Sequence, residues 1–189
     1  SLADTHYVDI GSASPTPPYN GGWGTAATNI QDAVDAASSN DLVLITNGTY
    51  RITNQITIAK AITVQGVNGA SNTIIVTTGG FVRCVYLNNA KAVVDGLTLC
   101  NGNGTGSMCG GGVYFNFGGE VANCIISNCK AYYGGGAYFY YGGTLRDSLI
   151  VSNGQSFGGG VYFECDGLVT NCQILNNRSY LGGGGVYCD

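Results

Sequence analysis

This chain of 189 residues has little charge, little proline and a single histidine. Charged side chains make up 10% of it, and seven Lys and Arg against eleven Asp and Glu give a formal net charge of −4. That balance excludes the basic footprint of a nucleic-acid-binding protein. The apolar runs are too short to form a membrane-spanning helix. With His6 as the only histidine and no Cys-x-x-Cys spacing, the sequence also lacks the ligand pattern of a transition-metal site.

Glycine, tyrosine and cysteine are abundant instead, with 32, 13 and 8 residues. One phrase, Gly-Gly-Gly followed by Val or Ala, Tyr, and Phe or Cys, occurs at residues 110–115, 134–139, 158–163 and 183–188. Its Val or Ala recurs at positions 113, 137, 161 and 186, a period of 24 or 25 residues that is typical of a solenoid. We therefore expect each repeat to form one coil of a stack.

A second segment of each repeat keeps the same register, at residues 121–129, 145–153 and 169–177. These segments are short, rich in β-branched residues and interrupted by Asn, which favours strands and excludes a helical solenoid. Residues 84–87 and 93–101 match the next repeat at an offset of 28. We predict an all-β parallel β-helix over residues 41–189, with about six coils of roughly 24–28 residues. Its first buried strand is expected at residues 41–45.

Residues 1–40 do not follow the repeat. We expect a strand at residues 6–10 and an irregular connector at 12–18. Thr28–Gln31 has the pattern of a capping box, and the apolar residues after it lie on one face of a helix that ends near Ser38: Ile30, Ala33, Val34 and Ala37. A helix over the first coil would block edge-to-edge association. We interpret residues 21–40 as an N-terminal cap.

At the other end the sequence stops inside the repeat phrase, at Asp189. A repeat array normally closes with a terminal repeat that has a polar outer face. We therefore predict an uncapped C-terminal coil, with two alternatives: the chain is a fragment or processed product of a longer solenoid, or another copy of the chain covers the open edge. In the second alternative the extended segment Ser1–Ile10 of the neighbour adds strands to the open edge.

Stacked coils place equivalent residues in columns about 4.8 Å apart. One column is made of tyrosines: Tyr86, Tyr114, Tyr138, Tyr162 and Tyr187. Because strand residues alternate between faces, the flanking Val and Phe are expected inside and the tyrosines outside. The rings are expected to stack on one another and cover the sheet. The alternative is that they form a ligand-binding or assembly face.

Two further columns contain Asn and Asp. The first is Asp95, Asn123, Asp147 and Asn171, and the second is Asn101, Cys129, Asn153 and Asn177. Such side chains bond neighbouring backbone groups in stacked turns and tolerate left-handed conformations, so we interpret both columns as a structural ladder. No cofactor is expected. Calcium is the alternative ligand, since it binds carboxylate and amide oxygens.

The eight cysteines favour an oxidising environment and hence a secreted or cell-surface protein. Their connectivity does not follow from spacing alone. From the predicted columns, Cys100 lies diagonally beside Cys129, and Cys84 lies close to the loop that carries Cys109. We predict these two pairs as the disulfide candidates.

Enzymatic chemistry on a β-helix would need paired carboxylates, or a cation and a base. The best candidates are Asp95, Asp147 and Arg146, which lie near one edge of the coils. The two carboxylates are expected about 9.6 Å apart, two strand spacings. That separation is at the outer limit for an inverting glycosidase pair.

The Gly-Gly-Gly-Val-Tyr phrases, together with Ile150-x-x-Asn153 and Ile174-x-x-Asn177, resemble the GGA and FxxN repeats of polymorphic outer membrane proteins and related bacterial surface β-helix proteins. This resemblance covers roughly residues 84–188. The opening, with Trp23 and the segment around residues 24–34, is similar to the N-terminal part of pectate-lyase-like right-handed β-helix proteins. The resemblance implies a right-handed solenoid displayed on a bacterial surface.

The main hypothesis from the sequence is therefore an extracellular structural or adhesive β-helix that self-assembles end to end, and the sequence leaves enzymatic activity undecided, with its absence favoured. Its partners would be further copies of itself and surface glycans. The alternative is a polysaccharide-binding or polysaccharide-degrading domain, either a lyase or a glycoside hydrolase.

Overall fold

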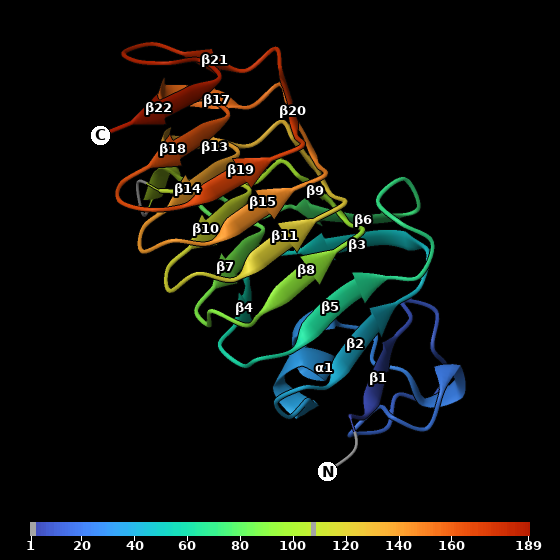
Figure 1. The fold of residues 1–189 in the computed structure, drawn as a ribbon. Helices are drawn as coiled ribbons and strands as arrows, with labels where there is room; N and C mark the ends of the chain where they lie inside the picture. The colour runs from blue at the N-terminus through green and yellow to red at the C-terminus, as the bar shows by residue number, and fades with distance from the viewer. Residues whose placement is uncertain (1–2, 107–108) are drawn as a thin grey trace.

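The computed structural model describes residues 3–106 and 109–189 and is a parallel β-helix of about six coils (Figure 1). Each coil contributes one strand to each of three stacked sheets, here called sheets A, B and C. A fourth, short sheet D adds a corner strand to each of the last three coils. All strand pairs are parallel, so the chain advances by one strand position per coil.

Sheet A contains β1 Thr5–Val8, β2 Leu42–Ile45, β5 Thr63–Gly66, β8 Val93–Asp95, β11 Glu120–Ala122, β15 Thr144–Arg146 and β19 Leu168–Thr170. Sheet B contains β3 Gly48–Ile52, β6 Thr73–Thr77, β9 Thr98–Cys100, β12 Ile125–Ser127, β16 Leu149–Val151 and β20 Gln173–Leu175. Sheet C contains β4 Ile56–Ile58, β7 Val85–Leu87, β10 Val113–Phe115, β14 Ala137–Phe139, β18 Val161–Phe163 and β22 Val186–Cys188. Sheet D contains β13 Lys130–Tyr133, β17 Gly154–Phe157 and β21 Arg178–Ser179.

The core is a column of apolar side chains that runs through the middle of the coils. Phe115 stacks on Phe139 with ring centroids 4.3 Å apart, and Phe139 stacks on Phe163 at 4.7 Å. Leu145 and Ile150 face the same interior and are fully buried. The alternation of strand side chains thus sorts Val, Leu, Ile and Phe inward, as the sequence pattern predicts.

The N-terminal elements pack on the first coil. β1 pairs with β2 in register, and helix α1, Ile30–Ala36, lies against β1, β2 and β4. The helix is slightly shorter than predicted at both ends. It begins one residue later because its N-cap is Asn29 rather than Thr28, and the Asn29 side chain accepts a hydrogen bond from the N–H of Gln31. It ends at Ala36, before the predicted end near Ser38. The strand is also shifted, since β1 ends at Val8 and does not reach Ile10. Two 3-10 turns complete the chain, at Trp23–Thr25 and Gly104–Gly106.

A buried His6–Asp41 pair fastens this N-terminal part to the first coil. His6 Nε2 lies 3.0 Å from Asp41 Oδ2, and His6 Nδ1 lies 2.6 Å from the carbonyl oxygen of Pro18. Asp41 also accepts hydrogen bonds from the N–H groups of Asp4 and Ser38. The segment Ser1–Ile10 was predicted to pair with a neighbouring copy, but one edge of β1 within it already pairs with β2 of the same chain. Ser1 and Leu2 lie outside the described residues. Whether another copy pairs with its free edge stays a prediction.

The Gly triplets mark a corner where neighbouring coils come very close. The N–H of Gly111 donates to the oxygen of Gly134, and the N–H of Gly135 donates to the oxygen of Gly158. A Cβ at position 135 would lie 2.5 Å from the oxygen of Gly154 and 2.6 Å from that of Gly159. Only a residue without a side chain fits there.

The predicted register of the third coil is wrong by one residue. In sheet C, Val85 pairs with Val113, an offset of 28. In sheet A, however, Val94 pairs with Val121, an offset of 27, because the turn into β11 is one residue shorter than the turn into β8. A one-residue slip moves every side chain to the other face. The predicted columns therefore need correction at their first members.

The first Asn and Asp column consists of Gly96, Asn123, Asp147 and Asn171, all with positive φ, and Asp95 precedes it by one residue. The second column begins with Gly102 rather than Asn101. Here the N–H of Gly102 contacts Cys129 Sγ, the N–H of Cys129 donates to Asn153 Oδ1, and the N–H of Asn153 donates to Asn177 Oδ1. Asn101 belongs to a parallel column of left-handed turn residues with Asn128, Ser152 and Asn176.

All eight cysteines are free thiols in the structure, so neither predicted disulfide is formed. The slip moves Cys100 away from Cys129, because Cys100 pairs with Ser127 in sheet B. Cys84 lies beside Gly112 as predicted, but its thiol is buried and does not meet Cys109. Each predicted pair joins a buried thiol, Cys84 or Cys129, to a half-exposed one, Cys109 or Cys100. The two buried thiols instead meet each other, since the Cys84 thiol is hydrogen-bonded to Cys129 in the core.

Candidate functional site

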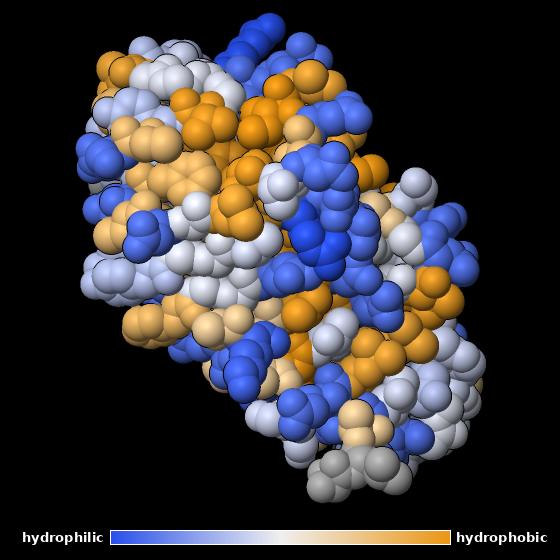
Figure 2. Space-filling model, in the orientation of Figure 1, coloured by the Kyte–Doolittle hydropathy of each residue, from blue (hydrophilic) through white to orange (hydrophobic). Residues whose placement is uncertain are grey.

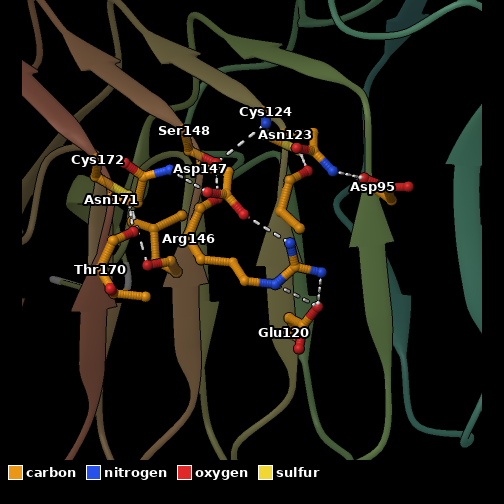
Figure 3. A network of polar contacts seen from close by, with 12 residues as sticks. Asp95, Glu120, Asn123, Cys124, Arg146, Asp147, Ser148, Thr170, Asn171 and Cys172 are labelled. Atoms are coloured by element: carbon orange, nitrogen blue, oxygen red, sulfur yellow. Dashed lines mark hydrogen bonds and ion pairs between the residues drawn. The ribbon is translucent and has the colours of Figure 1, made fainter.

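A row of polar side chains crosses the coils on the outer face of sheet A and at the turn that follows it (Figure 3). Its first group is centred on Asp95, at the end of β8. Gln65 Nε2 donates to Asp95 Oδ2 at 2.8 Å, and Asn123 Nδ2 donates to Asp95 Oδ1 at 2.7 Å. Both carboxylate oxygens of Asp95 are therefore bonded to amides of the coils on either side.

The second group is centred on Arg146, at the end of β15. Its Nη2 and Nε donate to Glu120 Oε1 at 2.6 and 3.0 Å, and its Nη1 donates to Asp147 Oδ2 at 2.7 Å. Asn171 Nδ2 donates to the other oxygen of Asp147. The group thus spans three coils, from β11 to the turn after β19, as Figure 3 shows. Glu120 is not part of the predicted site, although it completes the guanidinium's contacts.

These contacts set the charge states of the group. Hydrogen bonds from Asn171 and then from Arg146 hold the pKa of Asp147 below its usual value, against the opposing effect of desolvation. Hydrogen bonds to Asp147 and Glu120 raise the pKa of Arg146. The Arg146, Glu120 and Asp147 side chains are each about a third exposed, so solvent screens the ion pairs.

Glycoside hydrolysis requires a carboxylic acid that keeps its proton near neutral pH. Asp147 is shifted in the opposite direction, and Asp95 accepts two amide hydrogen bonds. The structure therefore brings Asp95, Asp147 and Arg146 to one side of the solenoid, as predicted, but as members of a hydrogen-bonded polar network. The arrangement presents fixed hydrogen-bonding groups along the coils rather than an acid and a base.

The calcium alternative has no support in this geometry. Within residues 3–106 and 109–189, no group of three or more His, Cys, Asp or Glu side chains lies close enough together to hold a metal ion. In the Asn and Asp column, Asp147 already accepts from its neighbours Arg146 and Asn171.

The predicted tyrosine column exists on the outer face of sheet C. Successive ring centroids from Tyr86 to Tyr187 lie 5.3, 4.9, 5.4 and 5.3 Å apart. The rings therefore cover one another, and further aromatic residues cover the column from the side, so that Tyr138 is 4% and Tyr162 2% exposed. The stacking interpretation is confirmed, and the ring faces in the middle of the column are not free to bind a ligand.

A mixed polar cluster lies at the middle of this column and was not predicted. Tyr138 donates to Glu164 Oε2 at 3.0 Å, its hydroxyl also reaches the Cys109 thiol, and the Arg83 guanidinium lies 4.8 Å from the ring centroid of Tyr114. Desolvation raises the pKa of the Cys109 thiol and raises the pKa of Tyr114 to about 12. Burial thus disfavours the ionised form of both the Cys109 thiol and the Tyr114 hydroxyl.

The exposed aromatic surface lies elsewhere, at the turns that lead into sheet A. Phe117 and Tyr141 are each 54% exposed, and their rings stack with centroids 5.9 Å apart and planes 14° apart. Each is followed by a pair of glycines with positive φ, which turns the chain sharply into β11 or β15. Sequence reasoning missed this pair because it lies outside the repeat phrase; the signal was an aromatic residue before Gly-Gly in two successive coils.

The aromatic pair and the polar row share one side of the molecule. Phe117 precedes Glu120 by three residues, and Tyr141 precedes Thr144, the first residue of β15, by the same interval. In Figure 2, which has the orientation of Figure 1, hydrophilic and hydrophobic side chains share this side, and hydrophobic ones gather over its upper part, where the last coils lie. Leu168 and Leu175 of those coils are 53% and 47% exposed.

Comparison with known proteins places the fold. No protein-family model matches the sequence, and no curated protein matches it. Solved structures do match. Pectin methylesterase PemA from Erwinia chrysanthemi superposes with a TM-score of 0.65 at 14% identity, over 94% of this chain and 57% of that one. The chain has the pectate-lyase-like parallel β-helix fold.

Two further pectin methylesterases share this β-helix. One, solved in complex with a hexasaccharide, has a TM-score of 0.64 at 14% identity, over 94% of this chain and 57% of its own. The enzyme from Aspergillus niger has a TM-score of 0.50 at 16% identity, over 99% of this chain and 69% of its own. The chain therefore spans 57% of the length of the first two structures. The comparisons do not extend the resemblance to polymorphic outer membrane proteins, for which no repeat family model matches.

No helix among the described residues has the length and apolarity needed to cross a lipid bilayer.

Proposed function

We propose that this β-helix binds a polysaccharide outside the cell, and that a linear glycan lies across the coils beside sheet A. The observation that carries the proposal is the exposed Phe117–Tyr141 stack next to the polar row. In this arrangement the aromatic rings support the apolar face of a sugar ring. The Glu120–Arg146–Asp147 group and its amide neighbours then bond the hydroxyl groups.

The chemistry of the two surfaces fits a sugar. Aromatic rings offer large, rigid apolar faces, and ligand sites combine such faces with a few convergent polar groups. The polar row supplies carboxylate, amide and guanidinium groups whose orientation is fixed by hydrogen bonds to adjacent coils. Because the same positions recur in successive coils, they match a ligand that is itself a repeating chain.

The fold comparison supports the same class of ligand. One of the matching pectin methylesterases was solved in complex with a hexasaccharide, so a protein with this β-helix fold can bind an oligosaccharide. A polysaccharide ligand also fits the secreted or cell-surface location expected from the sequence. Catalysis by Asp95, Asp147 and Arg146 is not part of the proposal, because hydrogen bonds hold the pKa of Asp147 below its usual value and both oxygens of Asp95 accept hydrogen bonds from amides.

The proposal is tested by measuring binding of highly methyl-esterified pectin and of a neutral glucan oligosaccharide by isothermal titration calorimetry. We expect at least one of them to bind the wild type. We expect Phe117→Ala and Tyr141→Ala each to weaken that binding about tenfold, which corresponds to about 1.4 kcal/mol of lost aromatic contact. Phe81→Ala is the matched control, because Phe81 is 74% exposed and lies on a different loop.

Two results would contradict the proposal. One is the absence of binding to either glycan by the wild type. The other is a Phe117→Ala/Tyr141→Ala double variant that binds as tightly as the control. End-to-end self-assembly, the main hypothesis from the sequence, stays a prediction, and sedimentation velocity over a range of protein concentrations tests it separately.

A further inference from the structure

A groove runs along the corner where sheet B meets sheet D. It has a volume of about 580 Å³ and follows the solenoid axis over the last three coils. Its floor is formed by the stacked turns around Asn128, Ser152 and Asn176, and its wall is formed by the first residues of β13, β17 and β21. It is separate from the aromatic pair and the polar row, neither of which contributes to it.

Two basic side chains occupy one column of this groove. Lys130 pairs in register with Gly154, and Gly154 pairs with Arg178. The two cations are therefore two coils apart, about 9.6 Å along the axis. Gly154 lies between them without a side chain, where a Cβ would come within 2.7 Å of the oxygen of Arg178. The column therefore presents a cation on the first coil, no side chain on the second and a cation on the third.

The charges of this column are not neutralised within the groove. Lys130 and Arg178 are both exposed, and the ion pairs found among the described residues involve only His6–Asp41 and the Arg146 group. No acidic residue lines the groove, whereas amide and hydroxyl groups do: Asn128, Ser152, Gln155, Asn176 and Ser179. The chain as a whole has a net charge of −4, so this groove stands out as a local positive site.

We propose that this groove binds a carboxylated linear glycan, with one carboxylate at Arg178, another at Lys130 and the intervening sugar over Gly154. The inference rests on the proposed function for the ligand being a glycan, and it adds the charge class and a second binding surface. The planar guanidinium of Arg178 matches a carboxylate with two parallel hydrogen bonds, while Lys130 acts as a point charge. The surrounding amides and hydroxyls bond the sugar hydroxyls.

The geometry favours a polymer over a small anion. The two cations stand on strands two coils apart, so an extended chain that runs along the axis meets them one after the other. A nucleic acid carries many more charges than two cations neutralise, and the acidic chain as a whole repels it. A uronate chain has one carboxylate on each sugar, and its uncharged hydroxyls suit the neutral polar groups between the cations.

The experiment compares an unesterified oligogalacturonate with its fully methyl-esterified counterpart of the same length, by calorimetry at low and high salt. We expect the wild type to bind the unesterified form at least tenfold more tightly, and we expect this preference to shrink in high salt. Lys130→Gln and Arg178→Gln should each lower the ratio of the two affinities several-fold, and the double variant should bind the unesterified and esterified forms equally. Arg51→Gln is the matched control, because Arg51 is an exposed cation on β3 outside the groove.

The outcomes separate the two proposals. If the wild type binds both forms equally, or if the double variant keeps the preference, the groove inference is overturned while binding through Phe117 and Tyr141 still stands. If neither form nor the neutral glucan binds, both proposals are overturned. If single-stranded DNA of similar charge binds more tightly than the oligogalacturonate and loses its affinity in the double variant, the groove recognises polyanions in general and the glycan assignment is wrong.

Discussion

Replacement of Asn153 by Ala should be one of the most destabilising polar substitutions in this chain. Asn153 is 2% exposed and connects three coils. Its Oδ1 accepts from the N–H of Cys129 at 2.9 Å, and its Nδ2 donates to the oxygen of Ile126 at 2.9 Å and to Asn177 Oδ1 at 3.1 Å. The substitution removes these bonds and leaves the N–H of Cys129 unpaired in the interior, while the oxygen of Ile126 loses its side-chain donor.

The expected magnitude follows from the unpaired donor and from the two lost side-chain hydrogen bonds. An unsatisfied buried backbone donor costs about 1–3 kcal/mol and an ordinary hydrogen bond contributes about 1 kcal/mol, so we expect Asn153→Ala to lower the free energy of unfolding by roughly 2–4 kcal/mol. Asn177→Ala is the control in the same column. Asn177 makes equivalent bonds to Asn153 and to the oxygen of Ile150, but it is only half-buried, so water can replace part of what is lost. We expect about 1 kcal/mol there.

Urea unfolding followed by circular dichroism measures both variants, with the slope of the transition checked against the wild type because coils of a solenoid can unfold in steps. The reasoning would be refuted if Asn153→Ala fell within about 0.5 kcal/mol of the wild type. It would also be refuted if Asn177→Ala cost more than Asn153→Ala.

Two further predictions concern the N-terminal clamp and the core thiols. Desolvation raises the pKa of Asp41, but backbone hydrogen bonds and His6 outweigh it and hold the pKa below its usual value; the pair should therefore stabilise the fold above about pH 4 and lose that contribution as the pH falls further. Unfolding measurements of the wild type and Asp41→Asn should show a stability difference that shrinks below pH 4, and a constant difference would count against this assignment. For the thiols, iodoacetamide should alkylate the exposed Cys165 and Cys188 of the folded protein before the buried Cys84 and Cys129, because the thiolate must be accessible to react; peptide mapping of the labelled protein checks this order, and early labelling of Cys84 or Cys129 would contradict the core packing.

Much of the fold follows from the sequence because the repeat is direct. The Gly-Gly-Gly-Val-Tyr phrase places one strand of each coil, and the pairing of Val113 with Ala137 and of Ala137 with Val161 confirms its period. The register of the third coil was harder to predict. The turn before Glu120 is one residue shorter than the equivalent turn before β8, and the repeat phrase does not determine the length of the turns. That single residue decided which of the cysteines face the core.

The candidate site was less predictable for a different reason. Strand spacing places Asp95, Asp147 and Arg146 on one side, but it does not show that the long Arg146 side chain reaches back to Glu120 on the preceding coil. Nor does a column pattern find the Phe117–Tyr141 stack, since turns vary between coils while strands repeat. In a solenoid the positions of the strands can therefore be predicted from the sequence period, whereas the binding surface depends on turns that differ between coils.

The glycine corner has a consequence for how such a protein can change over time. At Gly135 and its equivalents any side chain would collide with backbone oxygens of two flanking segments, so these positions admit almost no gradual substitution. A coil that keeps its corner can still be copied or deleted as a unit, because each coil contacts its immediate neighbours through the same register. Each duplication would lengthen the molecule by about 4.8 Å. It would also add one position to the cation column. The gain or loss of whole repeats would therefore change the length of polymer that contacts the groove.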